Sequence, residues 1–187
     1  MSISLCRGCA GEKLTPVLSL GTMALANALR SEQQLTQDEQ IYPLELVLCE
    51  QCTLCQINET VPPEELFSQY TYFSSYSDTM LRHAAKLVQT LIDDRGLDED
   101  SLVVEIASND GYLLKNYCAR GVQVLGIEPA QNIAKVANER GVDTLCRFFG
   151  EEVADLLVAE GVKADVCLLY TSPSPRDATL SRMPSSA

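Results

Sequence analysis

The sequence predicts an α/β protein with a small zinc-ribbon-like N-terminal domain, followed by a Rossmann-like, doubly wound parallel sheet. Two observations predict this fold. Five of the eight cysteines lie within the first 55 of the 187 residues, in two closely spaced groups. From residue 101 onward, short apolar segments alternate with helical segments, and this alternation is typical of parallel strands joined by crossover helices.

The composition excludes several classes of protein. With 46% hydrophobic and 21% charged residues, the chain resembles ordinary globular proteins. Its formal charge of −12 argues against nucleic acid or an anionic membrane as a partner, because both require a basic surface. No apolar run approaches the ~18 residues of a membrane span, and the first residues lack the features of a signal peptide. We therefore expect a cytoplasmic protein, in which clustered cysteines more often bind metal than form disulfides.

The spacing of the first cysteines predicts a metal site. Cys6 and Cys9 form one C-x-x-C pair, and Cys49 and Cys52 begin a C-x-x-C-x-x-C group. Two-residue spacing lets a tight turn direct two thiolates at one ion, and two such turns supply the four ligands of tetrahedral Zn²⁺. The alternatives are a redox pair, which lacks its usual thioredoxin-like context here, an iron–sulfur cluster with the same number of ligands, and plain buried cysteines.

The other four cysteines lie in apolar surroundings, so we expect them to pack in the protein interior. Cys55 is expected beside the metal site, and Cys118, Cys146 and Cys167 are expected in the core.

Around the cysteine pairs, the sequence predicts a short strand followed by a glycine turn within residues 17–30. It predicts an antiparallel strand over residues 41–52. Because only ~60 residues are involved, bound metal would supply much of the folding energy of this domain.

The middle of the chain predicts an irregular segment and a helix. Residues 62–77 are rich in proline and tyrosine, as a linker or lid would be. Apolar residues then recur at helical spacing, with Asp78 as the expected N-cap and an end near Gly96. His83 lies beside the apolar stripe, and we expect a packed or solvated histidine rather than a ligand or base.

The following alternation predicts a parallel sheet. Each predicted strand is short and apolar, and each predicted helix ends at or near a glycine, so right-handed crossovers join neighbouring parallel strands. The expected strands are residues 101–107, 122–129, 142–149 and 164–170, and the expected helices are residues 111–121, 130–141 and 150–161.

The turn after the first of these strands differs from a dinucleotide-binding turn. In such sheets a ligand lies over the carboxyl ends of the strands. A pyrophosphate would require G-x-G-x-x-G, but residues 105–111 read E-I-A-S-N-D-G, with one glycine and an acidic residue where the phosphates would lie. Ser108, Asn109 and Asp110 could instead hold an ammonium and a carboxylate.

The end of the second strand supplies a further acidic residue. Glu128 follows the first turn by about 20 residues, where a carboxylate can accept both ribose hydroxyls. A tight turn and a surface glutamate are the alternative interpretations of these residues. Taken together, the turn and Glu128 favour a nucleoside with a charged amino-acid tail as the ligand, namely S-adenosylmethionine. Phe148 and Phe149 are candidates to stack on its adenine.

Several uncommon strings occur in the order found in one family of enzymes. They are C-R-G-C at 6–9, L-G-x-x-x-L-A-N-A-L at 20–29, Y-P-L-E-L-V-L-C-E-Q-C at 42–52, Y-x-Y-F-S-S-Y-S at 70–77, V-E-I-A-S-N-D-G at 104–111 and G-I-E-P-A-x-N-I-A at 126–134. With these strings the chain resembles the nucleotide-sugar C-methyltransferases, which use S-adenosylmethionine and act on keto-deoxysugars. The resemblance extends to about residue 169.

The resemblance implies an order of domains. Residues 1–60 would be the zinc-binding domain, and residues 61–96 a tyrosine-rich linker and helix. Residues 97–170 would form the N-terminal half of the methyltransferase domain. In the family, a substrate-side domain follows.

The resemblance also implies a set of site residues. Tyr76 matches a tyrosine that reaches the sugar, and Ala107 replaces the glycine usual in the turn. The zinc ligands would be Cys6, Cys9, Cys49 and Cys52, and the cofactor would lie against Glu105, Ala107, Ser108, Asn109, Asp110, Gly111, Glu128, Pro129, Phe148 and Phe149.

The implied reaction is methylation of a carbon beside a ketone. A base removes the acidified proton, and the enolate attacks the sulfonium methyl group. The family's presumed base is a histidine in a Tyr-x-Glu-His-like segment, which this sequence lacks. Serine and proline make up 8 of the 17 residues at 171–187, so we expect an unstructured tail that resembles translated vector sequence, or else a natural disordered tail. A chain of this kind is expected to bind the cofactor poorly and not to turn over.

Two other functions are compatible with parts of the sequence. The N-terminal domain could be a zinc-ribbon binding module, although three basic and seven acidic residues over 1–60 argue against nucleic acid. An NAD-dependent sugar oxidoreductase is disfavoured by the absent G-x-G-x-x-G. The expected partner is therefore a nucleotide-sugar substrate.

Overall fold

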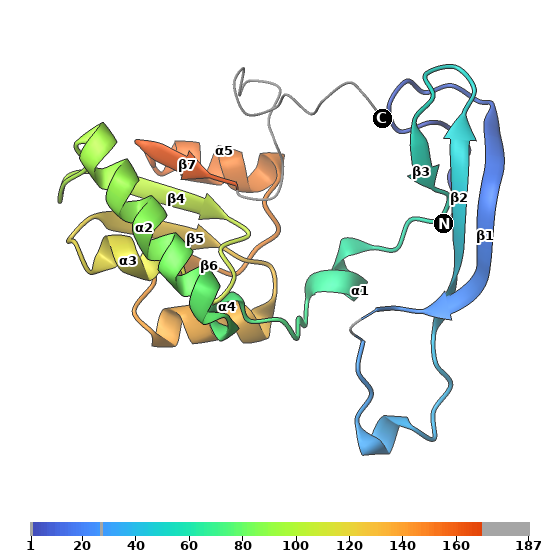
Figure 1. Cartoon of the computed structure of the whole chain (residues 1–187), viewed down its shortest axis with the longest axis horizontal. Helices are drawn as coiled ribbons and strands as arrows, with labels where there is room; N and C mark the ends of the chain where they lie inside the picture. Colours follow the sequence, from blue (N-terminus) through green and yellow to red (C-terminus); the bar gives the residue numbers. More distant parts are fainter. Residues whose placement is uncertain (1, 27, 170–187) are drawn as a thin grey trace. The chain divides into compact units, whose positions relative to one another are not determined.

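The computed structural model describes residues 2–26 and 28–169, and the chain divides into two compact units between Thr71 and Tyr72 (Figure 1). The N-terminal unit contains an antiparallel sheet, and the second unit, called the sheet unit below, contains a parallel sheet with helices. The predicted fold class, a small cysteine-bearing domain followed by a Rossmann-like α/β unit, is confirmed. The predicted division at residues 60 and 96 stays a prediction.

The sheet of the N-terminal unit has the strand order β1-β2-β3, with each neighbouring pair antiparallel. The predicted strand at 41–52 is confirmed as β2. The strand before the predicted glycine turn is longer than expected, because Gly21, at φ +77°, lies in a shift of register inside β1 instead of ending it. The bounds are β1 Leu14–Ala24, β2 Ile41–Cys49 and β3 Cys55–Ile57, with short helices η1 Glu32–Gln34 and α1 Pro63–Phe67.

The N-terminal unit has little hydrophobic core. Among its described residues, the buried hydrophobic side chains are Cys6, Val47 and Cys49. Much of β1 is exposed, including Val17 and Leu20. The burial of apolar side chains therefore provides little stabilisation to this unit, and the cysteines occupy the place of a core.

The sheet unit contains every strand and helix that the alternation predicts. All pairs in its four-stranded sheet are parallel, in the order β6-β5-β4-β7. The elements are η2 Ser74–Tyr76, α2 Asp78–Arg95, β4 Leu102–Ile106, α3 Leu114–Cys118, β5 Gln123–Ile127, α4 Gln131–Glu139, β6 Thr144–Leu145, α5 Glu151–Ala159 and β7 Val166–Leu168.

The helix α2 is capped at both ends. The side chain of Ser77 accepts a hydrogen bond from Met80 N, so Ser77 is the N-cap and the prediction of Asp78 was wrong by one residue. The shorter side chain of Ser77 reaches the amide, while Asp78 adds a negative charge to the first turn. Gly96 ends the helix in the left-handed conformation, as predicted.

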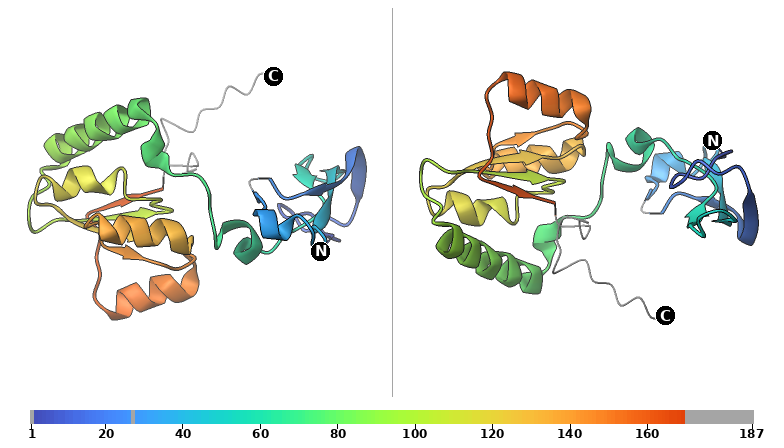
Figure 2. Two further views of the ribbon diagram at one scale, coloured as in Figure 1. Left: turned by 90° about the horizontal axis from the view of Figure 1, so that it is seen from below. Right: turned by 90° about the horizontal axis from the view of Figure 1, so that it is seen from above.

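Successive residues of β4 point to opposite faces of the sheet and into separate clusters of core residues. Val103 packs with Ala84 and Val88 of α2 and with Tyr117 of α3. Val104 packs with the cluster that contains Val153 of α5. Figure 2 shows α2 and α5 on opposite sides of the sheet. Helices on both faces make the sheet doubly wound, as predicted.

The order of the strands positions a site. The chain moves outward from β4 to β5 and β6, and then returns to place β7 on the other side of β4. The end of β4 is therefore the topological switch point, where open α/β sheets bind ligands. The turns after β4 and β5 lie at this same edge of the sheet.

Two of the three cysteines predicted in the core, Cys146 and Cys167, are exposed, so these predictions were wrong. Cys55, which was predicted to pack beside the metal site, lies in β3 opposite Leu48 and is exposed. Both β3 and β7 are edge strands, and their apolar sequence does not ensure burial. Cys118 packs against the core of the sheet unit and is half-buried. His83 is exposed on α2.

None of the described helices is long and apolar enough to cross a membrane. The predicted tail at 171–187 lies outside the described residues.

Replacing Gly126 by alanine should destabilise the sheet unit. A Cβ atom at this position in β5 would lie 2.5 Å from Ser108 Oγ and 2.9 Å from Thr144 Oγ1. Such overpacking costs about 1–3 kcal/mol of unfolding free energy, measurable by urea denaturation. Gly150 is the matched control, because a Cβ atom there would meet no atom within 4 Å. Equal losses in Gly126→Ala and Gly150→Ala would contradict the packing argument.

Candidate functional site

The four cysteines predicted as metal ligands form one cluster. The Sγ atoms of Cys6, Cys9, Cys49 and Cys52 all lie within 4.8 Å of one another. The Sγ–Sγ distance is 3.6 Å for Cys6 and Cys52, and also 3.6 Å for Cys9 and Cys49. These distances exclude disulfides, which require about 2.05 Å. They match the ~3.8 Å edge of a tetrahedron with Zn–S bonds of about 2.3 Å.

The two cysteine pairs share one backbone geometry. In the first, Ala10 N donates to Cys6 O over 2.9 Å, and in the second, Thr53 N donates to Cys49 O over 2.9 Å. Ala10 and Thr53 are both left-handed, with φ of 57° and 62°. Two matching turns from the two ends of the unit thus present two thiols each to one point.

Hydrogen bonds favour the ionised form of one ligand. Gly8 N and Gln56 Nε2 donate to Cys6 Sγ over 3.4 and 3.3 Å. Burial opposes ionisation of Cys6, but these donors and the backbone of Cys9 outweigh it and lower the pKa of the thiol to about 6. Gln56 is itself buried, and its side-chain oxygen accepts from Arg7 N over 3.1 Å. Sequence reasoning missed Gln56, because it has no metal-ligand spacing.

The neighbouring thiols raise the pKa of Cys9, whereas the pKa of Cys6 is lowered. Gly11 N favours the thiolate of Cys9, but Cys52 and burial oppose it, and the pKa of Cys9 rises to about 12. Four thiolates so close together repel one another unless a cation lies between them. The set of donors therefore fits a tetrahedral, thiolate-binding ion, and Zn²⁺ is the ion that such closed sites hold in proteins.

In the sheet unit, the turns after β4 and β5 are joined by hydrogen bonds. Ala107 N and Ser108 N both donate to Ile127 O, over 2.8 and 3.2 Å. Ala107 and Asn109 are left-handed, at φ of 59° and 50°. Ala107 therefore takes the backbone conformation that favours glycine, as expected for the position where the resemblance implies glycine.

Glu128 lies between these two turns and is buried. Its Oε2 accepts from Asn109 N and its Oε1 accepts from Ala130 N, each over 2.9 Å. Burial raises the pKa of Glu128, and the two backbone donors partly oppose that rise. Both oxygens retain lone pairs, so the carboxylate can accept further hydrogen bonds at the switch point.

Glu105 is the most deeply buried acid of this edge, with no exposed surface. Neither of its carboxyl oxygens has a hydrogen-bond partner within the described structure, and the same holds for the hydroxyl of Tyr117. Burial, and then the nearby Glu128, raise the pKa of Glu105 to about 8. Burial and Glu105 together raise the pKa of Tyr117 to about 12. Glu105 is therefore neutral at pH 7 in this structure.

The side chains of Asn109 and Asp110 contact the segment before α2. Asn109 Oδ1 accepts from Ser74 N over 2.8 Å, and Asn109 Nδ2 donates to Tyr72 O over 3.1 Å. Asp110 Oδ2 accepts from the Ser75 hydroxyl and forms an ion pair of 2.7 Å with Arg140 Nη1. The sequence analysis did not identify Ser75 or Arg140, since nothing in a single sequence relates positions so far apart.

The remaining predicted residues lie around the same edge with different exposure. Phe148 and Phe149 follow β6 and are exposed, and Pro129 is half-buried. Tyr76 is 92% exposed, so its side chain is free to meet another molecule. The assignment of these residues to cofactor and substrate stays a prediction.

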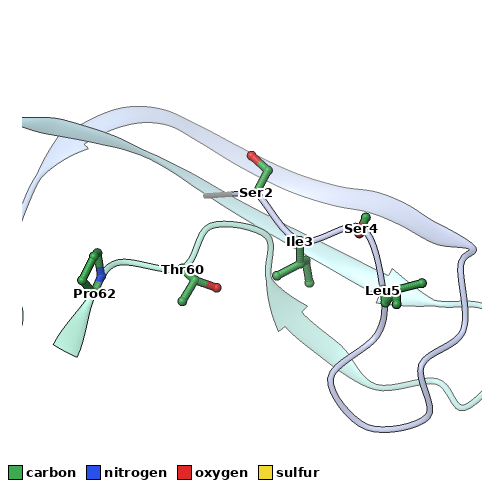
Figure 3. A pocket seen from close by; sticks show the side chains of 6 residues that line it. All are labelled: Ser2, Ile3, Ser4, Leu5, Thr60 and Pro62. Carbon is green, nitrogen blue, oxygen red and sulfur yellow. The ribbon is translucent and has the colours of Figure 1, made fainter.

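The N-terminal unit also has an open groove of about 490 Å³ (Figure 3). It is lined by Ser2, Ile3, Ser4, Leu5, Thr60 and Pro62. Three of these side chains carry hydroxyl groups and three are apolar, and none of the six is titratable.

Replacing one cysteine of the cluster should abolish stoichiometric zinc binding. Cys52→Ser removes one of the four ligands, and about one equivalent of zinc in the parent chain should fall well below stoichiometry, as measured by elemental analysis after dialysis. Cys55→Ser is the matched control, because this exposed cysteine is outside the cluster. Zinc retention by Cys52→Ser, or equal loss in both variants, would contradict the four-cysteine site.

Glu105→Gln should flatten the dependence of stability on pH. The folded state keeps the Glu105 proton up to a pKa of about 8, whereas the ordinary value is 4.5. The folded state therefore binds more protons in this window, and the unfolding free energy falls as pH rises, by up to about 1.4 kcal/mol per pH unit. The uncharged glutamine does not titrate and removes this fall.

This effect can be measured by urea denaturation at several pH values between about 5 and 8, followed by far-UV circular dichroism. Helices α2 to α5 lie in the sheet unit and dominate this signal. Glu139→Gln, an exposed change on α4, should keep the parent slope. A Glu105→Gln variant that keeps the parent slope would contradict a protonated Glu105.

Comparisons with known proteins agree with this geometry. The family model Methyltransf_13, described as a putative zinc binding domain, matches residues 6–67. Over 150 residues the chain is 35% identical to the C-methyltransferase NovU of Streptomyces niveus, a match that covers 80% of this chain and 36% of the relative. The chain thus spans about a third of the length of this curated relative.

Solved structures give weaker matches. An RNA methyltransferase from Salinibacter ruber, in complex with S-adenosyl-L-homocysteine, is 15% identical with a TM-score of 0.30 over 40% of this chain and 65% of that chain. The MccD protein is 17% identical with a TM-score of 0.27 over 43% of this chain and 30% of that chain. The family model and the curated relative agree with the predicted resemblance: residues 6–67 match a zinc-binding domain family, and the chain is similar to a C-methyltransferase over 80% of its length.

Proposed function

We propose that this chain contributes the zinc-binding and methyl-donor-binding parts of an S-adenosylmethionine-dependent C-methyltransferase. The observation that carries the proposal is Glu128, a buried carboxylate between the turns that follow β4 and β5. The identity to NovU extends over most of the chain and supports the same reaction class. Because the chain spans about a third of that relative, the activity of the whole protein is part of the proposal.

The residues at the switch point fit the parts of this cofactor. Glu128 is positioned to accept the ribose hydroxyls with the lone pairs that its backbone donors leave free. Ser108 Oγ and Asp110 Oδ1 are buried and have no hydrogen-bond partner within the described structure. Such groups require a polar partner, and an ammonium or carboxylate of an amino-acid tail supplies one.

The same edge does not suit a dinucleotide. A pyrophosphate requires a glycine-rich turn whose N–H groups are free, but Asn109 N is bound to Glu128. Neither an NAD-dependent oxidoreductase nor a stand-alone zinc-ribbon module is favoured by the relatives of the chain.

We propose a nucleotide-linked keto-deoxysugar as the substrate, in the cytoplasm. S-adenosylmethionine supplies an electrophilic methyl group. The reaction requires that a base remove the proton from a carbon beside the ketone, and that this carbon then form the new C–C bond as the C–S bond breaks. Tyr76 is well exposed and could orient the sugar through its hydroxyl.

The zinc ion serves folding in this proposal. All four protein ligands come from cysteine, which leaves no open coordination position for a substrate or water. The ion would hold the two cysteine turns together in a unit that has almost no hydrophobic core.

Isothermal titration of the zinc-loaded full chain with S-adenosylmethionine and with NADH tests the cofactor. We expect weak but measurable heat from S-adenosylmethionine and none from NADH, in keeping with the poor binding expected of this chain, and an affinity about tenfold weaker or more in Glu128→Gln, because hydrogen bonds to a charged group are lost. Glu139→Gln, on the exposed face of α4, should bind as the parent does. Binding of NADH alone would overturn the proposal, and an unchanged affinity in Glu128→Gln would overturn the role of Glu128.

A further inference from the structure

The segment of residues 72–76, called the strap below, is fastened to the turn after β4 by several hydrogen bonds. The side-chain amide of Asn109 bonds to the strap through both of its polar atoms. Its Oδ1 accepts from Ser74 N, and its Nδ2 donates to Tyr72 O. Ser74 is buried, although its neighbours on both sides are more accessible. The strap therefore docks at its centre, on the same turn that lies at the switch point.

Arg140 completes this attachment. Its Nη1 lies 2.7 Å from Asp110 Oδ2 and 3.2 Å from the hydroxyl of Ser75. The Asp110 side chain is fully buried, whereas that of Arg140 is 47% exposed. A buried carboxylate without a counter-charge is costly, so Arg140 supplies the counter-charge of Asp110 and fixes its orientation.

We propose that Arg140 is a positioning residue that fastens the strap, through Asp110 and Ser75, to the turn of the methyl-donor site. Docking of the strap and binding of the ligand are then coupled. The coupling rests on the proposed function, whereas the fastening itself does not.

The geometry gives a reason for the coupling. Arg140 and Ser75 both use Asp110 Oδ2, which leaves Oδ1 buried and without a hydrogen-bond partner within the described structure. A docked strap thus presents Oδ1 in a fixed orientation to a ligand at the switch point. A free strap would leave Asp110 to rotate, and the ligand would bear the cost of ordering it.

The same fastening positions Tyr76. This exposed residue adjoins Ser75 at one end of the strap, and Ser77 is held by its hydrogen bond to Met80 N at the start of α2. The tyrosine is therefore carried by a segment held on both sides. Its position depends on residues that follow it by more than 30 positions in the chain.

Hydrogen–deuterium exchange of the full chain without ligand tests the fastening. The amide of Ser74 is the reporter, because it is buried and donates to Asn109 Oδ1. We expect Arg140→Ala and Ser75→Ala to raise its exchange rate about fivefold or more, and Arg140→Lys to restore much of the protection. Lys135→Met is the matched control, since it removes a cation from an exposed ion pair on α4.

Exchange in β4 and β5 separates local release from unfolding. If Arg140→Ala raises exchange throughout the sheet unit, Ser75→Ala, which leaves the ion pair intact, becomes the deciding variant. Parent-like exchange of Ser74 in Ser75→Ala, or an increase as large in Lys135→Met, would overturn the fastening.

Titration with S-adenosylmethionine tests the coupling. Because coupling is reciprocal, saturating ligand should slow exchange at Ser74 by about fivefold or more, and Arg140→Ala should weaken ligand binding to the extent that it releases the strap. Ligand binding that leaves exchange at Ser74 unchanged would overturn the coupling. A parent chain that binds no S-adenosylmethionine while Ser74 still responds to Arg140→Ala would refute the proposed cofactor and leave the fastening in place.

Discussion

The carboxylate of Glu128 is the constraint around which the ligand edge of the sheet unit is built. It accepts Asn109 N from the turn after β4 and Ala130 N from the start of α4, so one buried side chain ties two crossover connections together. The close approach of the two turns explains why Gly126 must lack a side chain beside Ser108. It also fixes the backbone of Asn109, whose side chain can then face the strap. The geometry of both turns thus depends on a single glutamate at the end of a strand.

The N-terminal unit depends on a different interaction. Its described residues bury two cysteines and one valine as hydrophobic side chains, and these cysteines belong to the thiol cluster. The matching turns at Cys6 and Cys49 direct their thiols to one point, but without an ion the thiols oppose one another's ionisation. A bound Zn²⁺ removes this conflict and replaces a core that the sequence does not provide. The two units are therefore stabilised by distinct physical means, one by metal and the other by packing on both faces of a sheet.

These differences explain what could be predicted from the sequence. The strand and helix alternation after residue 101 was predicted correctly because each element carries its own periodicity and its own glycine stop. The four-cysteine cluster was predicted from local spacing. The apolar neighbours of Cys55 and Cys167 in the sequence led us to expect buried side chains, but both are exposed. Burial also depends on whether a strand lies at the edge of its sheet. The partners of Asp110 were not predictable, since they are joined only by the folded topology.

The charge at the switch point narrows the kind of ligand that can bind there. Three carboxyl groups gather within it, those of Glu105, Asp110 and Glu128, and each is buried. Arg140 pairs with Asp110, and burial raises the pKa of Glu105 to about 8, which leaves Glu128, held by two backbone donors, as the third acid of this edge. A pyrophosphate would add charge of the same sign in a region of low dielectric, whereas a sulfonium and an ammonium bring the opposite sign. An acidic edge of this kind suits the cationic nucleoside that we propose as the ligand, before any contact with its base is considered.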